Sequence, residues 1–204
     1  MQSLSKVRKL ESVKSYGIEI ECFIGVEHSN KTPKRYEYLG FWYVDSDGSL
    51  SRTYFGDSAY EFVSQPLPMN WLLKEITRLE KRVGNWHAND SCGTHVHVNR
   101  KWLTDSKAEA IAKFLETLSD SDIKQLFGRV SKDYAYNKFD KKSRYVAVNF
   151  TNKTTIEFRM FAGGNAKWNR YCLLMADYMV KHAFQLNWDA IAAASDMFKA
   201  QEGV

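Results

Sequence analysis

The chain has 204 residues, of which 44% are hydrophobic and 26% charged, and it contains three prolines. A chain of this size and composition can bury a sizeable core in one domain, and the composition indicates a globular protein with disorder only at its short ends. The net charge of +5 favours an anionic partner. The basic residues are scattered along the chain, so nucleic acid is not the favoured partner.

The cysteines and the lack of long apolar runs indicate a protein of a reducing compartment. Cys22, Cys92 and Cys172 are far apart and form no Cys-x-x-Cys pair, so we expect reduced, buried thiols. The N-terminus lacks the apolar segment of a signal peptide, and no apolar run approaches the roughly 20 residues of a membrane span. We expect a cytoplasmic, single-domain protein without membrane contact, in which residues 1–13 are a lead-in and residues 186–204 a helical tail.

The first half of the chain predicts three strands and a helix. Apolar and polar side chains alternate in three stretches, 14–23, 41–44 and 59–64, which is typical of strands. Residues 65–68 contain two prolines and end the third strand. Apolar residues at helical spacing then predict a helix over 69–83, with Gly84 as its C-terminal stop.

The second half predicts one more strand, two helices, a hairpin and two final helices. In chain order these are 92–98, 104–118 (begun by Thr104 and Asp105), 119–127, 144–150, 155–161, 166–185 and 188–198. Residues 128–143 are basic and lack a clear period, which indicates a mobile loop over an anionic ligand. The elements do not alternate as strand and helix. We therefore expect an α+β fold with a mainly antiparallel sheet of about six strands and helices on one side.

Several predicted strands carry ligands or charges on one face and apolar residues on the other. Because strand side chains alternate with period two, residues two apart share a face. The polar set comprises Glu19 and Glu21 in the first strand, Glu61 in the third, His95 and His97 in the fourth, and Glu157 and Arg159 in the last. A lone Glu-x-Glu pair is usually a solvated face, but the mixture of Glu, His and Arg at strand centres favours one shared cleft.

The carboxylates of this cleft need counter-charge. Carboxylates on one surface raise each other's pKa unless cations lie between them. Mg²⁺ is bound by carboxylate oxygens, and substrate phosphates often complete its shell. Arg159 has no place in a pure metal cage but suits a phosphoryl group. The residues therefore predict a site for metal and phosphate together.

Two other interpretations stay open. His95 and His97 with a Glu could hold Zn²⁺ in a hydrolase, although the chain has no His-Glu-x-x-His, and a strand would place Cys92 on the face opposite His95. Alternatively, a non-enzymatic basic module would bind nucleic acid through residues 138–144 and leave the carboxylates solvated. No Gly-rich phosphate loop and no Gly-x-Ser-x-Gly elbow is present, which excludes P-loop, Rossmann and elbow-type serine hydrolase sites.

Five short motifs resemble, in their order, those of the amidoligase family. They are Gly17-Ile18-Glu19-Ile20-Glu21, Asp47-Gly48-Ser49-Leu50, Tyr60-Glu61-Phe62-Val63-Ser64-Gln65-Pro66-Leu67, Cys92-Gly93-Thr94-His95-Val96-His97-Val98 and Thr155-Ile156-Glu157-Phe158-Arg159. That family belongs to the carboxylate–amine ligases that share the fold of glutamine synthetase and glutamate–cysteine ligase. The fourth motif is similar to the Gly-small-His-x-His strand of glutamine synthetase, and the fifth to its Glu-x-Arg strand. The resemblance extends over residues 14–170.

The resemblance implies a curved, half-barrel-like sheet similar to the catalytic domain of glutamine synthetase. It also implies a reaction that depends on ATP and on Mg²⁺ or Mn²⁺. ATP would phosphorylate a carboxylate to an acyl phosphate, and an amine would displace the phosphate to leave an amide. The substrates would be a carboxylate and an amine, from among peptides, amino acids and nucleotide derivatives. Small relatives are often encoded by phages or in bacterial gene clusters.

Matching motifs carry residue roles to this chain. Five side chains would hold the divalent metals: Glu19, Glu21, Glu61, His95 and Glu157. Arg159 would neutralise the transferring phosphoryl group, with Arg144 as a second candidate, and His97 would contact a phosphate of ATP. Asp47 and Ser49 would face the substrate or the amine. This division suits phosphoryl transfer, which depends on positioning and charge neutralisation.

Overall fold

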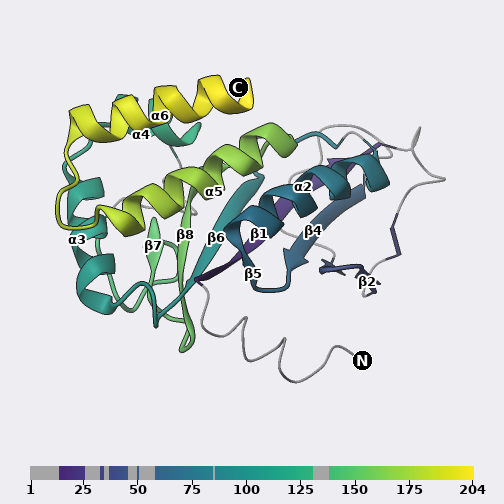
Figure 1. The fold of residues 1–204 in the computed structure, drawn as a ribbon, viewed down its shortest axis with the longest axis horizontal. Coiled ribbons are helices and arrows are strands. Elements are labelled where there is room, and N and C mark those ends of the chain that lie inside the picture. Colours follow the sequence, from purple (N-terminus) through teal and green to yellow (C-terminus); the bar gives the residue numbers. More distant parts are fainter. Residues whose placement is uncertain are drawn as a thin grey trace.

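The computed structural model describes residues 14–25, 33–34, 37–45, 50, 58–84, 86–130 and 138–204. In these residues the chain forms one mostly antiparallel, curved sheet with helices packed against it (Figure 1). The predicted α+β fold is therefore confirmed. Within the described part of the chain, no helix is both long and apolar enough to cross a membrane.

Eight strands of the described residues make up the sheet. They are β1 (Ser15–Ile24), β2 (Tyr38–Leu39), β3 (Trp42–Asp45), β4 (Ser58–Ser64), β5 (Leu67–Pro68), β6 (Gly93–Asn99), β7 (Val148–Asn149) and β8 (Thr155–Ala162). Their order is β2-β3-β4-β1-β6-β8-β7, and β5 pairs with the start of β1. The longest strand, β1, therefore lies in the middle and pairs antiparallel with β4 on one side and β6 on the other.

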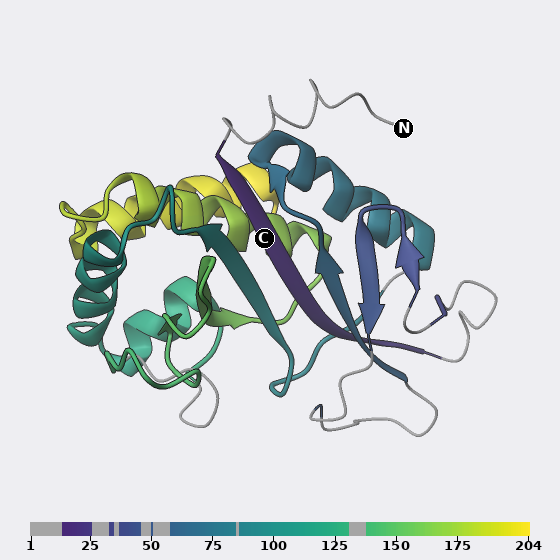
Figure 2. The ribbon, with the colours of Figure 1, turned by 90° about the horizontal axis from the view of Figure 1, so that it is seen from below.

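The helices cover one face of the sheet and its β7 end. α2 (Met69–Val83) and α5 (Ala166–Lys181) lie across β1 and β6, and α6 (Trp188–Glu202) packs on α5 (Figures 1 and 2). α3 (Asp105–Glu116) contacts β7 and α4 (Asp120–Phe127) contacts β8. Since these helices shield only one face of the central strands, the residues on the opposite face remain available for chemistry.

Sequence signals at the helix ends explain most of the boundaries. Ser119 and Asp122 form a capping box at the start of α4, which satisfies otherwise unpaired N–H groups. Gly84 ends α2 with a φ of 84°, as predicted. Thr104 precedes α3, but its side chain makes no capping hydrogen bond. The three cysteines are free and buried, as expected of structural thiols.

The main core lies between the sheet and α2 and α5. Strand residues of one parity are buried there, including Ile18, Ile20, Phe62, Val96, Val98, Phe158 and Met160, together with Leu72, Ile76, Tyr171 and Met175 of the helices. The strand residues of the other parity include the Glu, His and Arg side chains of the predicted cleft. The predicted separation of an apolar and a polar face is therefore present in the folded chain.

The structure differs from the sequence prediction in its short elements. The strand expected over 144–150 is reduced to the two residues of β7. At its expected start, the Ser143 hydroxyl accepts the Tyr145 N–H at 3.1 Å, so a local turn replaces strand pairing there. β2 lies outside the predicted strands, and β5 pairs with β1 at residues that were expected only to end the third strand. The last helix but one ends at Lys181 rather than at residue 185.

Candidate active site

The register of the sheet places the polar residues in one band across neighbouring strands. The direct cross-strand pairs are Asp45 with Glu61, Glu61 with Glu21, Glu19 with His95, His97 with Glu157, and Glu157 with Asn149. Side chains that are opposite one another on adjacent strands are about 5 Å apart at Cβ. Residues separated by up to 138 positions in the sequence, such as Glu19 and Glu157, therefore share one site.

The imidazole of His95 lies at the centre of this band. Its Nδ1 is 3.3 Å from Glu19 Oε2 and 3.4 Å from Glu157 Oε1, and its Nε2 is 3.7 Å from Glu21 Oε1. His95 is 3% exposed. Two strands, β1 and β8, thus direct three carboxylates at one buried ring.

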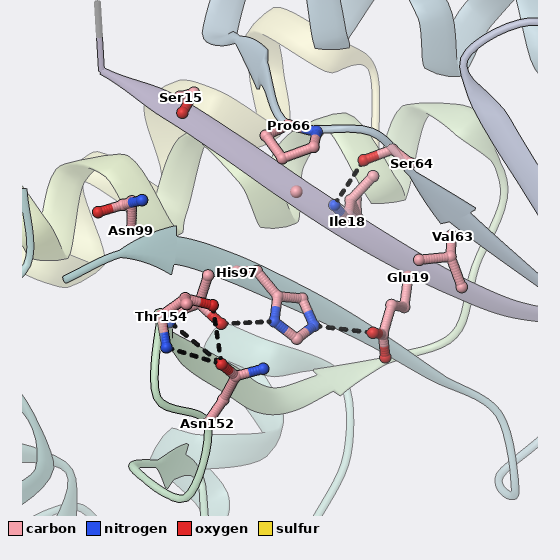
Figure 3. Close-up of a pocket in the computed structure, with 12 residues that line it drawn as sticks. Ser15, Ile18, Glu19, Val63, Ser64, Pro66, His97, Asn99, Asn152 and Thr154 are labelled. Atoms are coloured by element: carbon pink, nitrogen blue, oxygen red, sulfur yellow. Dashed lines mark hydrogen bonds and ion pairs between the residues drawn. The ribbon is translucent and has the colours of Figure 1, made fainter. Parts of the chain in front are cut away.

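The second histidine pairs with the same glutamate from the other side. His97 Nε2 is 3.0 Å from Glu19 Oε1, and Nδ1 is 3.4 Å from Thr155 Oγ1 (Figure 3). Burial lowers the pKa of His97, but the Glu19 carboxylate outweighs burial, and the pKa is raised overall. Burial likewise raises the pKa of Glu19, but hydrogen bonds from His95 and His97 hold that pKa well below its ordinary value. Glu19 is therefore ionised and bound by both imidazoles.

Two groups of side chains have the geometry of a cation site. The ligand atoms of Glu19, Glu61 and His95 lie within 4.8 Å of one another, as do those of Glu19, His97 and Glu157. Carboxylate oxygens are ligands that Mg²⁺ and Mn²⁺ prefer, whereas an imidazole nitrogen also suits Zn²⁺. Glu19 belongs to both groups, so it would bridge two cations.

Glu21 is held differently from the other carboxylates. Its Oε2 accepts the backbone N–H of Gly93 at 2.5 Å, and Glu21 belongs to neither of the two groups. A Cβ at Gly93 would lie 2.8 Å from His95 Nε2 and 3.2 Å from Glu21 Oε2, so only glycine lets the strand approach so closely. The role of Glu21 as a metal ligand stays a prediction.

Glu157 is oriented through both of its oxygens. Arg159 Nη1 donates to Oε1 at 2.6 Å, and Asn149 Nδ2 donates to Oε2 at 2.7 Å. Arg159 Nε is buried and has no hydrogen-bond partner in the described part of the chain. Buried donors without a partner are rare in folded proteins, so this guanidinium has unused capacity for an anion. Asn149 was not expected at the site from the sequence.

A second arginine that sequence reasoning missed lies beside the cluster. Arg129 Nη1 donates to the Cys92 carbonyl at 2.9 Å, and Nη2 donates to the Arg159 carbonyl at 3.1 Å. Residues 128–143 had been expected to form a mobile loop, and 131–137 lie outside the described residues, but Arg129 is bound to β8 and to the residue that precedes β6. Nothing in the sequence distinguishes Arg129 from the other basic residues of this stretch, so its place at the site could not be predicted.

Three predicted site residues are not placed in this cluster. Arg144 is exposed, and its guanidinium lies over the Tyr145 ring, 5.5 Å from the ring centroid. Asp47 and Ser49 lie outside the described residues. Their roles stay predictions.

Cys92 is not on the face where alternation had placed it. It precedes β6 and belongs to a small buried cluster with Phe23, Leu50 and Ala59. Phe23 and Ala59 have the strand parity of Glu21 and Glu61, so Cys92 packs at the end of the acidic face. The prediction was wrong because strand alternation does not extend to a residue outside the strand. Cys92 is in neither cation group.

A pocket of about 220 Å³ adjoins the cluster at His97 and Glu19. The other residues that line it are neutral and include Gly17, Ser64, Asn99, Asn152, Thr154 and Thr155 (Figure 3). Glu19 and His97 thus belong both to the pocket and to the cluster of ligands. The site therefore has three neighbouring parts, which are a neutral pocket, a cluster of carboxylates and imidazoles, and two arginines.

Comparison with known families identifies the family of this chain. Residues 12–121 match the family model described as "Putative amidoligase enzyme", which is more than half of the chain. The chain belongs to the amidoligase family. The family name denotes an enzyme that forms amide bonds. A comparison with curated proteins gives no match.

The family match covers only part of the site of this amidoligase. It includes β1, β4 and β6 but ends at residue 121, before β8. The pairing of β8 with β6 is what brings Glu157 and Arg159 to the histidines. The structure of this amidoligase therefore extends the site beyond the part of the chain that the family model covers.

Proposed function

We propose that this amidoligase is an ATP- and Mg²⁺-dependent carboxylate–amine ligase that works through an acyl phosphate. The observation that carries the proposal is the position of His95 within 3.4 Å of both Glu19 and Glu157, with Arg159 bound to Glu157. A set of carboxylates and imidazoles suits divalent cations, and an arginine beside it suits a phosphoryl group. Phosphoryl transfer needs both of these in one place.

The carboxylates and imidazoles would hold the cations. Glu19, Glu61 and His95 would form one site, and Glu19, His97 and Glu157 the other. Bound Mg²⁺, or Mn²⁺ in its place, would neutralise charge on the phosphate oxygens. Arg159 would bind an oxygen of the transferring group through its unpartnered Nε, while Nη1 keeps Glu157 in place.

The proposed reaction has two steps. A carboxylate oxygen of the first substrate attacks the γ-phosphorus of ATP, and the bond from that phosphorus to the β,γ-bridging oxygen breaks to release ADP. The nitrogen of the amine then attacks the acyl carbon, the bond from that carbon to the phosphate oxygen breaks, and the amine nitrogen releases a proton to solvent. The products are an amide, ADP and inorganic phosphate. The chain supplies positioning and fixed charge for both steps.

The neutral pocket would take the nucleoside part of ATP. Hydroxyl and amide side chains line it beside His97, and such groups suit a ribose and a base. The phosphates would then run from His97 across the ligand cluster to Arg159. The acyl and amine substrates, from among peptides, amino acids and nucleotide derivatives, would meet the phosphoryl group at the arginine end. Free cysteines and the use of ATP support a cytoplasmic enzyme.

Calorimetric titration with a non-hydrolysable ATP analogue tests the proposal. We expect binding in the presence of Mg²⁺, and loss of binding without Mg²⁺ and in Glu157→Ala. Glu75→Ala is the matched control, since Glu75 lies on α2 and pairs with Arg78. Wild-type protein that does not bind the analogue with Mg²⁺ present would overturn the proposal.

A further inference from the structure

A β-bulge in β8 lies opposite His95. Thr94 pairs with Phe161 and Val96 pairs with Phe158, and the register shifts between these two pairs. One residue of β6, His95, therefore faces two residues of β8, Arg159 and Met160. A bulge of this kind twists the strand and changes the direction of its side chains, and bulges are frequent beside active sites. Arg159 is one of the two residues of this bulge.

Both backbone polar groups of Arg159 have a partner, and the partner of its carbonyl is the Arg129 side chain. Toward β7, the Arg159 N–H donates to the Ala147 carbonyl at 2.8 Å. Toward β6, the Arg159 carbonyl accepts Nη2 of Arg129 at 3.1 Å. Nη1 of the same guanidinium donates to the Cys92 carbonyl at 2.9 Å. Arg129 thus connects the bulge of β8 with the residue that precedes β6.

The fold directs Arg129 to this position from the end of α4. Gly128 ends α4 with a φ of 82°, in the left-handed conformation, which favours glycine. The Arg129 side chain is packed so closely that a Cβ at Gly93 would lie 2.7 Å from its Nη2. The N–H of Gly93 in turn holds Glu21. One guanidinium therefore contacts the backbone that sets the positions of Glu21 and Arg159.

We propose that Arg129 is a positioning residue for the ligase reaction. By binding both carbonyls it fixes the bulge, and the bulge sets the direction of the Arg159 side chain and the spacing between His95 and β8. A guanidinium can span two acceptors because its donors form a rigid planar fork, which a lysine lacks. This inference rests on the proposed function for the role of Arg159.

Three variants measure the effect. Arg129→Gln removes the fork, and Arg129→Lys keeps a positive charge beside Glu21 without spanning both carbonyls. We expect both to bind the Mg²⁺-dependent ATP analogue about tenfold more weakly than wild type, which corresponds to about 1.4 kcal/mol. Arg170→Gln is the control, because Arg170 pairs with Glu202 on α6. Wild-type affinity in Arg129→Lys would overturn the proposal, since charge alone would then suffice.

A double-mutant cycle with Arg159→Gln separates positioning from general loss of stability. If Arg129 acts through Arg159, adding Arg129→Gln to Arg159→Gln weakens analogue binding little further. Fully additive losses would overturn the proposal. If Arg129→Gln does not fold, Arg129→Lys is used in the same cycle.

Titration with Mn²⁺ in the absence of nucleotide distinguishes failure of the Arg129 proposal from failure of the ligase proposal. If wild-type protein binds Mn²⁺ but not the nucleotide, the ligase proposal fails, and the positioning role is judged on Mn²⁺ affinity. The bulge sets the spacing of His95 and Glu157, so Arg129→Gln and Arg129→Lys should then bind Mn²⁺ more weakly than Arg170→Gln. Equal Mn²⁺ affinities in all three variants would overturn the inference.

Discussion

Glu19 and His95 are direct partners on adjacent strands, and Glu19 Oε2 lies 3.3 Å from His95 Nδ1. Glu19 Oε1 lies 3.0 Å from His97 Nε2. One carboxylate thus serves two imidazoles that share a strand face. This pairing makes Glu19 the residue on which both cation groups depend.

Replacing Glu19 should affect both proposed cations, whereas replacing Glu61 should affect one. We expect Glu19→Gln to abolish measurable Mn²⁺ binding, because the amide removes the charge from both groups, and Glu61→Gln to remove only one of two binding events. Isothermal titration with Mn²⁺ measures this number. Two Mn²⁺ bound by Glu19→Gln at wild-type affinity would contradict the shared role.

The glycine that holds Glu21 should not tolerate a side chain. In Gly93→Ala the new Cβ would meet Arg129 Nη2 at 2.7 Å and His95 Nε2 at 2.8 Å, so we expect a loss of about 1–3 kcal/mol in the free energy of unfolding. Urea denaturation measures this difference. Gly17→Ala is a matched control in β1, because its Cβ would meet His97 Cβ at an ordinary 3.5 Å. Equal stability of the two variants would contradict the crowding at Gly93.

Asn149 should influence the proposed metal site without binding metal itself. Its amide orients Glu157 through Oε2, and loss of such an orienting hydrogen bond typically weakens metal binding about 10- to 100-fold. We expect Asn149→Ala to show this loss in an Mn²⁺ titration. An unchanged Mn²⁺ affinity, with the fold intact by circular dichroism, would show that Glu157 needs no such support.

Divalent metal should stabilise the folded protein. A ligand that binds only the native state at a hundred times its dissociation constant adds about 2.7 kcal/mol, so Mg²⁺ or Mn²⁺ should raise the melting temperature and a chelator should lower it. Glu157→Ala should lose this response. Stabilisation by Zn²⁺ alone, with stoichiometric zinc by elemental analysis, would instead favour the hydrolase interpretation.

A cluster remote from the site should make stability depend on pH. Asp177 on α5 accepts hydrogen bonds from Lys14 and Tyr16 and forms an ion pair with Lys181. Burial raises the pKa of Asp177, but the hydrogen bonds from Lys181, Tyr16 and Lys14 outweigh it and lower the pKa below 3.8. The stabilisation is therefore present above the ordinary pKa and is lost as the pH falls through the lowered value.

The variant Asp177→Asn tests this dependence. The difference in free energy of unfolding between wild type and Asp177→Asn should be largest near neutral pH and should shrink below pH 3.8. Denaturant titrations at neutral and acidic pH measure it. A difference that stays constant with pH would show that the charge of Asp177 is not what stabilises this cluster.

Strand periodicity was sufficient to predict most of the site. Alternation in β1, β6 and β8 places two glutamates, two histidines and the Glu157–Arg159 pair on polar faces, and the register confirms that these faces meet. The helices α2 and α4 could also be predicted, because their ends carry local signals in Gly84 and Ser119.

Features that depend on distant contacts could not be predicted. β5 has two residues and exists because it pairs with β1, and no period can be read from two residues. Arg129 acquires its position from carbonyls 37 and 30 residues away. The bulge opposite His95 arises from the pairing of β6 with β8. It therefore cannot be predicted from the sequence of either strand by itself.

The position of β8 in the chain has a consequence for biosynthesis. β8 covers the edge of β6 and supplies Glu157, yet it follows β6 by more than fifty residues. During translation, a nascent chain that ends before β8 therefore presents the histidine strand as an open edge, and such edges promote pairing with other chains. Only when β8 has emerged and paired do Glu157 and Arg159 join the carboxylates of β1 and β4 and the imidazoles of β6. Activity and protection from aggregation are thus acquired in the same late step.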